Sequence, residues 1–120
     1  GTLSCEKGLE EFLRDVIESL GCGGLRYRSG SGWVHRVAVG GGACGEYIPQ
    51  AIAQGCDTFV TSDLRYNDFL DTQGLNLIDA GHFPTENVVC PAIAAYLKAH
   101  FPEVQTVIST SHRDVIQYYL

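Results

Sequence analysis

The sequence lacks any long apolar run and any leader-like start. No stretch approaches the roughly 18 consecutive apolar residues of a membrane-spanning helix. The first residues show no basic segment followed by an apolar one, so no signal peptide and no membrane association are predicted. The 120 residues, 45% of them apolar, fit a single globular domain over 1–120 with one core.

Basic residues are scarce. Eight Lys and Arg stand against fourteen Asp and Glu, which gives a formal net charge of −6. A nucleic-acid-binding protein usually carries a basic face, and these eight residues are scattered along the chain. No nucleic-acid partner is therefore predicted, and the acidity is interpreted as favouring solubility.

The cysteine pattern lacks both an even count and a C-x-x-C pair. An odd number argues against a disulfide framework, and the missing pair argues against a zinc ribbon. We expect reduced cysteines that act as small apolar residues, and hence a cytoplasmic protein. The five residues are Cys5, Cys22, Cys44, Cys56 and Cys90.

Apolar periodicity predicts alternating strands and helices. Apolar residues recur at helical spacing over 9–20, where Gly21 ends the helix, and they alternate in the β-branched segment 33–39. Strands are predicted over 25–28, 33–39, 57–62, 75–80, 104–110 and 114–120, and helices over 9–20, 46–55, 64–74 and 85–101, the last kinked at Pro91. This order predicts an α/β fold, a mixed sheet flanked by helices on both faces in three layers.

Three polar loops follow three successive predicted strands: "GGGACGE", "TSD" and "AGH". Ligands of open α/β sheets bind outside the carboxyl ends of the strands. If the three strands are parallel, these loops lie together at one edge of the sheet. That edge is the predicted functional site.

The first loop carries a Gly40-x-Gly42-x-x-Gly45 pattern between a strand and a helix. Such glycines let backbone N–H groups approach a phosphate, and Asp63 follows the next strand, where a ribose-binding acid would lie. The chain is too short for a second mononucleotide-binding half, so NAD(P) binding is not predicted. A tight turn for close strand–helix packing, a loop that lines a ligand, and a small nucleotide-binding module over Gly40–Gly45 remain as interpretations.

The third loop places His82 four residues before Glu86. Imidazole and carboxylate are good ligands for divalent metals, and two residues alone are too few for a stable site. The alternatives are a hydrogen-bonded loop histidine and a glutamate favoured by the helix dipole. Asp63 is likewise either the N-cap of the next helix or a residue of the site.

Taken together, the segments "VGGGACGE", "TSD" with "YN", and "AGHFPTE" resemble the second half of the NGG-one-interacting-factor-three family, also described as GTP cyclohydrolase 1 type 2-like proteins. The resemblance extends more weakly over nearly the whole chain. It implies one half of a duplicated fold that holds two divalent metal ions between two similar halves. The implied function is that of a domain of a metal-dependent hydrolase acting on a nucleotide-like substrate such as GTP.

By this resemblance His82 and Glu86 are metal ligands. The residues that the resemblance places around them are Gly41, Gly42, Ala43, Gly45, Asp63 and Asn67. The family's other ligands, two histidines and an aspartate, belong to the first half and are absent here. We therefore expect this chain alone to bind metal weakly or not at all and to be inactive. The implied partners are an N-terminal half of the same protein and further copies in a homo-oligomer.

Two departures from the family pattern bear on activity. Asn67 stands after Tyr66 where the family usually has a histidine, and Ser62 replaces the glycine of the second motif. If that histidine handles protons or substrate phosphate, an activity has been lost here. The alternative function is a non-catalytic domain for protein interaction or assembly.

Overall fold

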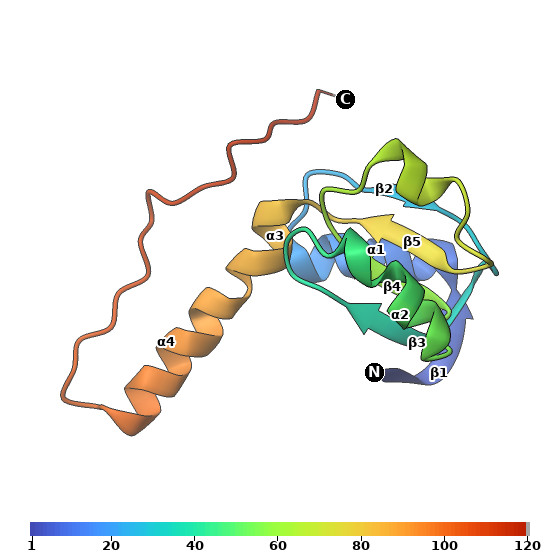
Figure 1. The fold of residues 1–120 in the computed structure, drawn as a ribbon. Coiled ribbons are helices and arrows are strands. Elements are labelled where there is room, and N and C mark those ends of the chain that lie inside the picture. The colour runs from blue at the N-terminus through green and yellow to red at the C-terminus, as the bar shows by residue number, and fades with distance from the viewer. Residues whose placement is uncertain (120) are drawn as a thin grey trace.

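A mixed five-stranded sheet forms the centre of the computed structural model, which describes residues 1–119 (Figure 1). The order across the sheet is β1-β3-β4-β5-β2. The strands are β1 (Thr2–Gly8), β2 (Arg26–Arg28), β3 (Trp33–Val39), β4 (Thr58–Thr61) and β5 (Asn76–Asp79). The central strands β3, β4 and β5 are parallel, whereas both edge strands run antiparallel to their neighbours.

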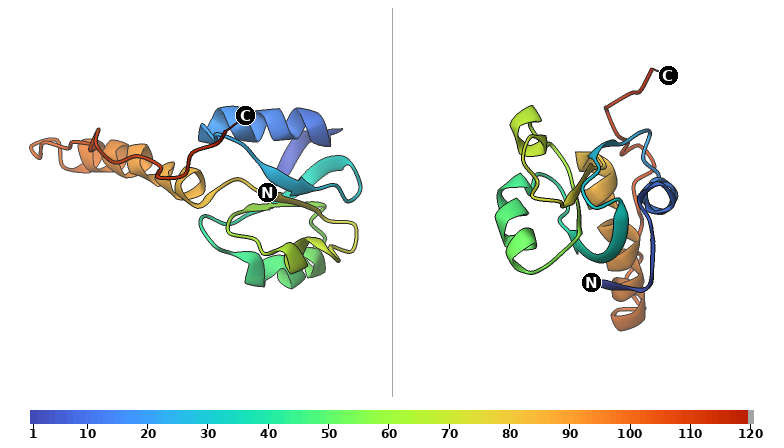
Figure 2. Two further views of the ribbon diagram at one scale, coloured as in Figure 1. Left: turned by 90° about the horizontal axis from the view of Figure 1, so that it is seen from above. Right: turned by 90° about the vertical axis from the view of Figure 1, so that its right-hand side faces the viewer.

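Helices cover both faces of the sheet, as Figure 2 shows. Helix α1 (Leu9–Leu20) packs on one face, where its apolar stripe meets β3, β4 and β5. The short helix η1 (Gly45–Tyr47) leads into α2 (Ile48–Ala53), which packs on the other face against Phe59 and Leu77. The predicted α/β class with helices on both faces is therefore confirmed.

The register of the parallel strands sets the position of the loops. Val39 pairs with Val60, and Thr61 pairs with Asp79, so all three strands end at the same edge. The segments that follow β3, β4 and β5 therefore emerge side by side.

Pro49 lies in the first turn of α2, where its missing N–H costs no helical hydrogen bond.

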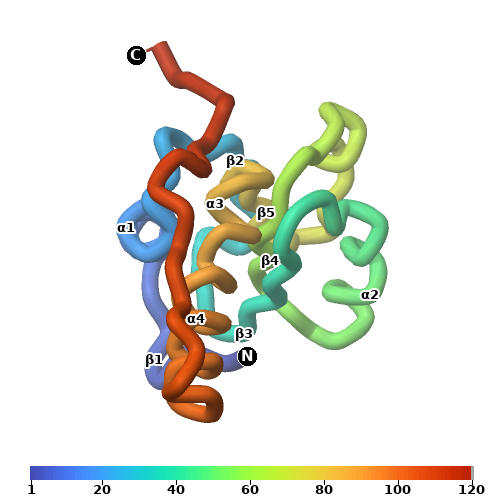
Figure 3. The backbone as a smooth tube through the Cα atoms, turned by 90° about the vertical axis from the view of Figure 1, so that its left-hand side faces the viewer, coloured from blue at the N-terminus to red at the C-terminus, as the bar shows by residue number. Residues whose placement is uncertain are grey.

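The last helical segment differs from the prediction. Helix α3 (His82–Asn87) begins three residues earlier than expected. The helix is interrupted at Val88, and a second helix, α4 (Val89–His100), follows. The break precedes Pro91, which falls in the first turn of α4, where proline is tolerated. Helix α4 points away from the sheet (Figure 1), and the chain from Phe101 onward turns back toward the sheet without forming a helix or strand (Figure 3).

Three other predictions were wrong. The predicted helix over 64–74 is a single 3-10 turn, η2 (Tyr66–Phe69), after which Gln73 takes a positive φ of 49°. Residues 104–110 and 114–119 form no strand, because their backbone pairs with no strand of the sheet; Leu120 lies outside the described residues. In addition, strand β1 was not predicted: its polar–apolar alternation over Thr2–Glu6 is short, and most of its residues are exposed.

Among the described residues, no helix is both long enough and apolar enough to cross a membrane.

Candidate functional site

The loop after β3 is held against the end of β4 by hydrogen bonds. The carbonyl of Gly42 accepts from the Thr61 hydroxyl at 2.9 Å and from the Ser62 amide at 3.1 Å. The amide of Cys44 donates to the same hydroxyl of Thr61 at 3.1 Å. Gly42 has a φ of +68°, which favours glycine, and it is buried. The loop is therefore a fixed wall of the site.

Helix α3 joins this wall through Thr85. The Thr85 hydroxyl accepts from the Gly42 amide at 3.0 Å and donates to the carbonyl of Gly81 or of His82, at 2.8 and 2.9 Å. Gly81, with a φ of +86°, turns the chain from β5 into the helix. The sequence interpretation gave Thr85 no role, although it stands beside Glu86 in the quoted motif.

The spacing of His82 and Glu86 places both side chains on one side of the first helical turn. The Nε2 atom of His82 lies 3.2 Å from Oε2 of Glu86, and both side chains are about half exposed. A Cβ atom on Gly42 would lie 2.5 Å from Glu86 Oε1 and 3.2 Å from His82 Nε2. Only a residue without a side chain leaves this space open.

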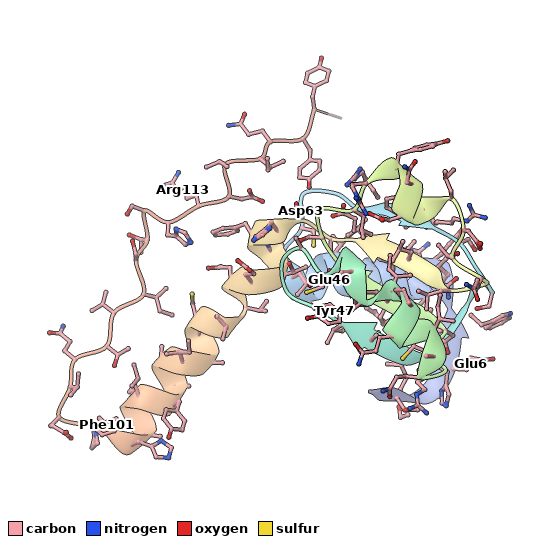
Figure 4. The ribbon with its side chains drawn as sticks, viewed as in Figure 1. Glu6, Glu46, Tyr47, Asp63, Phe101 and Arg113 are labelled. Carbon is pink, nitrogen blue, oxygen red and sulfur yellow. The ribbon has the colours of Figure 1, made fainter. Side chains whose placement is uncertain are left out.

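Asp63 completes the cluster from the third loop. Its Oδ2 lies 2.5 Å from Nδ1 of His82. The N-cap of η2 is Arg65, so the predicted capping role of Asp63 is wrong. Figure 4 shows Asp63 at the end of the sheet, next to α3.

The imidazole of His82 thus lies between two carboxylates. The hydrogen bond to Asp63 is the main cause that raises the pKa of His82 above its ordinary value; the charges of Glu86 and Asp63 add to it, and burial opposes it. A carboxylate can only accept, so Nδ1 carries the proton shared with Asp63. The Nε2 atom then faces Glu86 with a lone pair unless a proton or a metal cation lies between them.

The donor atoms fit one part of a divalent metal site. A cation about 2.1 Å from each of two ligand atoms, at a tetrahedral or octahedral angle, keeps them roughly 3.0–3.4 Å apart. The measured 3.2 Å falls within this range. No group of three or more His, Cys, Asp or Glu side chains within residues 1–119 is arranged to hold a metal ion. Asp63 faces the opposite ring nitrogen, which explains why it does not add a third donor.

A cavity of about 840 Å³ opens beside this cluster. Asp63, His82 and Glu86 line one side of it. Side chains from the extended C-terminal segment line the other side, among them Val115 and Ile116. Figure 4 shows this segment passing Arg113 on its way back toward the sheet.

The remaining predicted site residues lie at different distances from this cluster. Gly41 is close, since a Cβ there would lie 3.1 Å from the carbonyl oxygen of Thr85. Ala43 is exposed in the same loop, and Gly45 faces Leu64 and Asp68. Asn67 is exposed in η2 and does not line the cavity.

Asp79, which the sequence interpretation missed, holds together the loops that carry the cluster. This carboxylate at the end of β5 is almost fully buried and pairs with Arg26. It also accepts from the amides of Leu64 and Gly81 at 3.1 Å, so it links the loops after β4 and β5. An aspartate that ends a buried strand was the only signal available in the sequence.

Comparison with known proteins gives a consistent result. A family model described as Duf34/NIF3 (NGG1p interacting factor 3) matches residues 1–115. A GTP cyclohydrolase 1 type 2 homolog of Staphylococcus aureus (strain COL) is 34% identical over 117 residues, which cover 92% of this chain and 32% of that protein. A Deinococcus radiodurans protein of the same description is 36% identical over 103 residues, covering 84% and 39%.

Solved structures of similar fold come from the same group of proteins as these relatives. A hypothetical protein of Staphylococcus aureus superposes with a TM-score of 0.85 at 31% identity, covering 98% of this chain and 41% of that one. A Bacillus cereus protein related to NIF3 gives 0.82 at 31% identity, covering 99% and 35%. The chain spans about a third of the length of the curated relatives it matches. It belongs to the Duf34/NIF3 (NGG1p interacting factor 3) family.

Proposed function

We propose that this chain is the domain of a metal-dependent hydrolase, similar to GTP cyclohydrolase 1 type 2, that supplies His82 and Glu86 as ligands of a divalent cation. The observation that carries the proposal is the 3.2 Å approach of His82 Nε2 to Glu86 Oε2. The space that Gly42 leaves open beside both atoms supports it. The names of the relatives support the reaction class.

The chain's own residues hold and orient the ligands in this proposal. When bound, a divalent cation supplies Lewis acidity and lowers the pKa of a coordinated water. Glu86 and His82 bind it from α3, and Thr85 fixes that helix turn to the Gly42 loop. The other ligands come from the rest of a longer protein, because a stable site needs about three or four protein donors. In this proposal the complete site holds two such ions, as the family resemblance implies.

The substrate in this proposal is nucleotide-like, as the GTP in the relatives' names suggests. The cavity of about 840 Å³ beside the ligands lies within the usual size range of small-molecule sites. The Gly40–Gly45 loop is not favoured as an independent phosphate site, because the amides of Gly40, Gly42 and Cys44 already bond within the protein. Asn67, in place of the usual family histidine, is expected to lower turnover.

Metal titration of this chain tests the proposal. We expect a single weak cobalt(II) site by calorimetry, since only two protein ligands are present, and no GTP turnover. His82→Ala and Glu86→Gln should each weaken binding by about tenfold or more. Equal cobalt(II) binding by the unchanged chain and by both variants would contradict the proposal. Two tightly held ions per chain would show that further residues complete the site.

Two glycine variants give a matched control for the same titration. Gly42→Ala and Gly55→Ala introduce a side chain at nearly equal φ values, +68° and +72°. The backbone strain is therefore similar in both. Only the Cβ at position 42 meets Glu86 and His82, whereas nothing lies within 4 Å of the one at position 55. We expect Gly42→Ala alone to reduce cobalt(II) affinity.

The second candidate function is assembly, and one observation favours it. Residues 89–119, here called the C-terminal arm, consist of α4 and the extended segment after it, and α4 has no buried residue. The arm exposes eleven large apolar side chains: Val89, Ile93, Tyr96, Phe101, Val104, Val107, Ile108, Val115, Ile116, Tyr118 and Tyr119. Apolar surface of this extent is characteristic of an interface.

We propose that an N-terminal half of the same protein, or further copies in a homo-oligomer, cover the arm. Light scattering of the isolated chain should report more than one subunit, and Ile93→Glu should shift it toward the monomer. A chain that stays monomeric at high concentration would count against self-association.

The five cysteines of the chain are unpaired, which fits the reducing conditions of the cytoplasm.

A further inference from the structure

The backbone of Asp63 has an unusual conformation. Its φ is +54°, in the left-handed region that residues other than glycine seldom adopt and that aspartate and asparagine tolerate best. Asp63 and Gln73 are the two non-glycine residues with positive φ among residues 1–119. A glycine would fit this turn with less strain, so the side chain of Asp63 has to be explained by what it contacts.

That contact is the Nδ1 atom of His82, 2.5 Å from Asp63 Oδ2. A neutral imidazole has one N–H and one lone pair, and the hydrogen bond of one nitrogen fixes the role of the other. Since the carboxylate of Asp63 can only accept, it keeps the proton on Nδ1. The lone pair is then on Nε2, the atom that faces Glu86.

Without Asp63, the other tautomer would be favoured. Glu86 is also a carboxylate and would accept a proton from Nε2 at the observed 3.2 Å. That arrangement would occupy the lone pair that a cation needs and would leave the ring free to rotate. The two carboxylates therefore compete for the single N–H of His82, and the shorter contact belongs to Asp63.

We propose that Asp63 is a positioning residue, which holds His82 in the tautomer and ring orientation that present Nε2 as a ligand toward Glu86. The arrangement is a carboxylate–histidine–metal triad, in which Asp63 itself does not contact the cation. This inference rests on the proposed role of His82 and Glu86 as ligands. Asp63 comes from the loop after β4 and His82 from the start of α3, 19 positions later, so the fold as a whole sets the contact.

The first test uses the metal-free chain and reads the tautomer directly. Nitrogen-15 spectra of the His82 ring are recorded at alkaline pH, where the imidazole is neutral. We expect the Nδ1–H form to predominate in the unchanged chain. Asp63→Gly, in which glycine suits the positive φ, should make Nε2–H the major form. Asp63→Asn keeps a carbonyl acceptor and should retain most of the Nδ1–H form.

The second test is a cobalt(II) chloride titration followed by paramagnetic shifts. Loss of a carboxylate behind a metal-binding histidine typically weakens metal binding by about 10- to 100-fold, and we expect this for Asp63→Gly. Asp63→Asn should lie between Asp63→Gly and the unchanged chain. Glu46→Gln is the charge control, because it removes one negative charge from the neighbouring helix η1 and should change affinity less than about twofold.

The two tests separate this inference from the proposed function. If His82→Ala and Glu86→Gln bind cobalt(II) as the unchanged chain does, the ligand role of His82 and Glu86 fails, and the tautomer spectra still decide what Asp63 does. If Asp63→Gly leaves the Nδ1–H form predominant, or binds cobalt(II) as tightly as the unchanged chain, the positioning role of Asp63 is overturned while the metal site stands.

Discussion

The sheet with its covering helices and the C-terminal arm contrast sharply in one short chain. Every residue of the buried apolar core lies between Leu9 and Ala80. The arm contributes none of them, although it is rich in apolar side chains. The radius of gyration is 16.0 Å, whereas a compact chain of this length has about 13.6 Å. Apolar composition alone therefore does not make a core; a surface to pack against is also required.

The contrast has a consequence for function. The site lies where the two regions meet, since Asp63, His82 and Glu86 belong to the loops and α3, and the arm supplies the facing wall of the cavity. The sheet and its hydrogen-bonded loops fix the side of the cavity that carries the proposed metal ligands. The arm side depends on whatever covers the arm, so the proposed assembly and the proposed substrate cavity are linked.

The largest effect on the free energy of unfolding is expected when an apolar side chain is truncated in the sheet region, in comparison with one in the arm. Leu77 is fully buried in β5, and Leu77→Ala should lower the free energy of unfolding by about 2–5 kcal/mol. Ile93 in α4 is 51% exposed, and Ile93→Ala should change it by less than about 0.5 kcal/mol in the monomer. Urea denaturation of dilute protein measures both. Equal losses would show that the arm is part of the cooperative core.

The next effect concerns a buried polar group within the sheet region. Asn76 accepts from the amides of Gly30 and Gly32 and donates to the Trp33 carbonyl at 2.8 Å. Asn76→Ala leaves these groups without partners and should cost about 1–3 kcal/mol of unfolding free energy. Asn67→Ala, at an exposed position, is the control and should be nearly neutral. A neutral Asn76→Ala in the same denaturation assay would mean that water replaces the side chain.

A smaller effect is expected at Tyr118, one of the places where the arm meets the sheet region again. The ring of Tyr118 lies on the backbone of Gly23, and a Cβ there would overlap it. Gly23→Ala should release the end of the arm, so that trypsin cuts after Arg113 several-fold faster, with little change in the unfolding of the sheet. Gly8→Ala is the control, because nothing lies within 4 Å of its new Cβ. Unchanged cleavage in Gly23→Ala would show that Tyr118 does not hold the arm.

The smallest effect is a pH dependence confined to the sheet region. Hydrogen bonding to Arg65 holds the pKa of Asp68 below its unfolded value of 3.8. This stabilisation is present above pH 3.8 and is lost as the pH falls through the lower folded pKa. Asp68→Asn should therefore reduce stability slightly at neutral pH and by progressively less in acid. Thermal melts across this range measure it, and a constant difference would rule out the ion pair as the cause.

The local sequence pattern was sufficient to predict much of the fold and the proximity of one pair of candidate site residues. The helical spacing over 9–20 and the β-branched run of β3 each bury one face wherever they are placed, so their periodicity predicts them. The four-residue spacing of His82 and Glu86 brings them together once α3 forms, because that contact lies within one helical turn. The family resemblance drew attention to the same two residues.

Only the tertiary structure decided the rest of the site and the state of the arm. Asp63 meets His82, and Gly42 leaves room for Glu86, because the parallel register of β3, β4 and β5 ends all three strands at one edge. Residues 104–110 have the composition of a strand and form none, because a strand requires a neighbouring backbone and theirs pairs with no strand of the sheet. Periodicity reports which face of a segment is apolar, whereas partners distant in sequence exist only once the chain has folded.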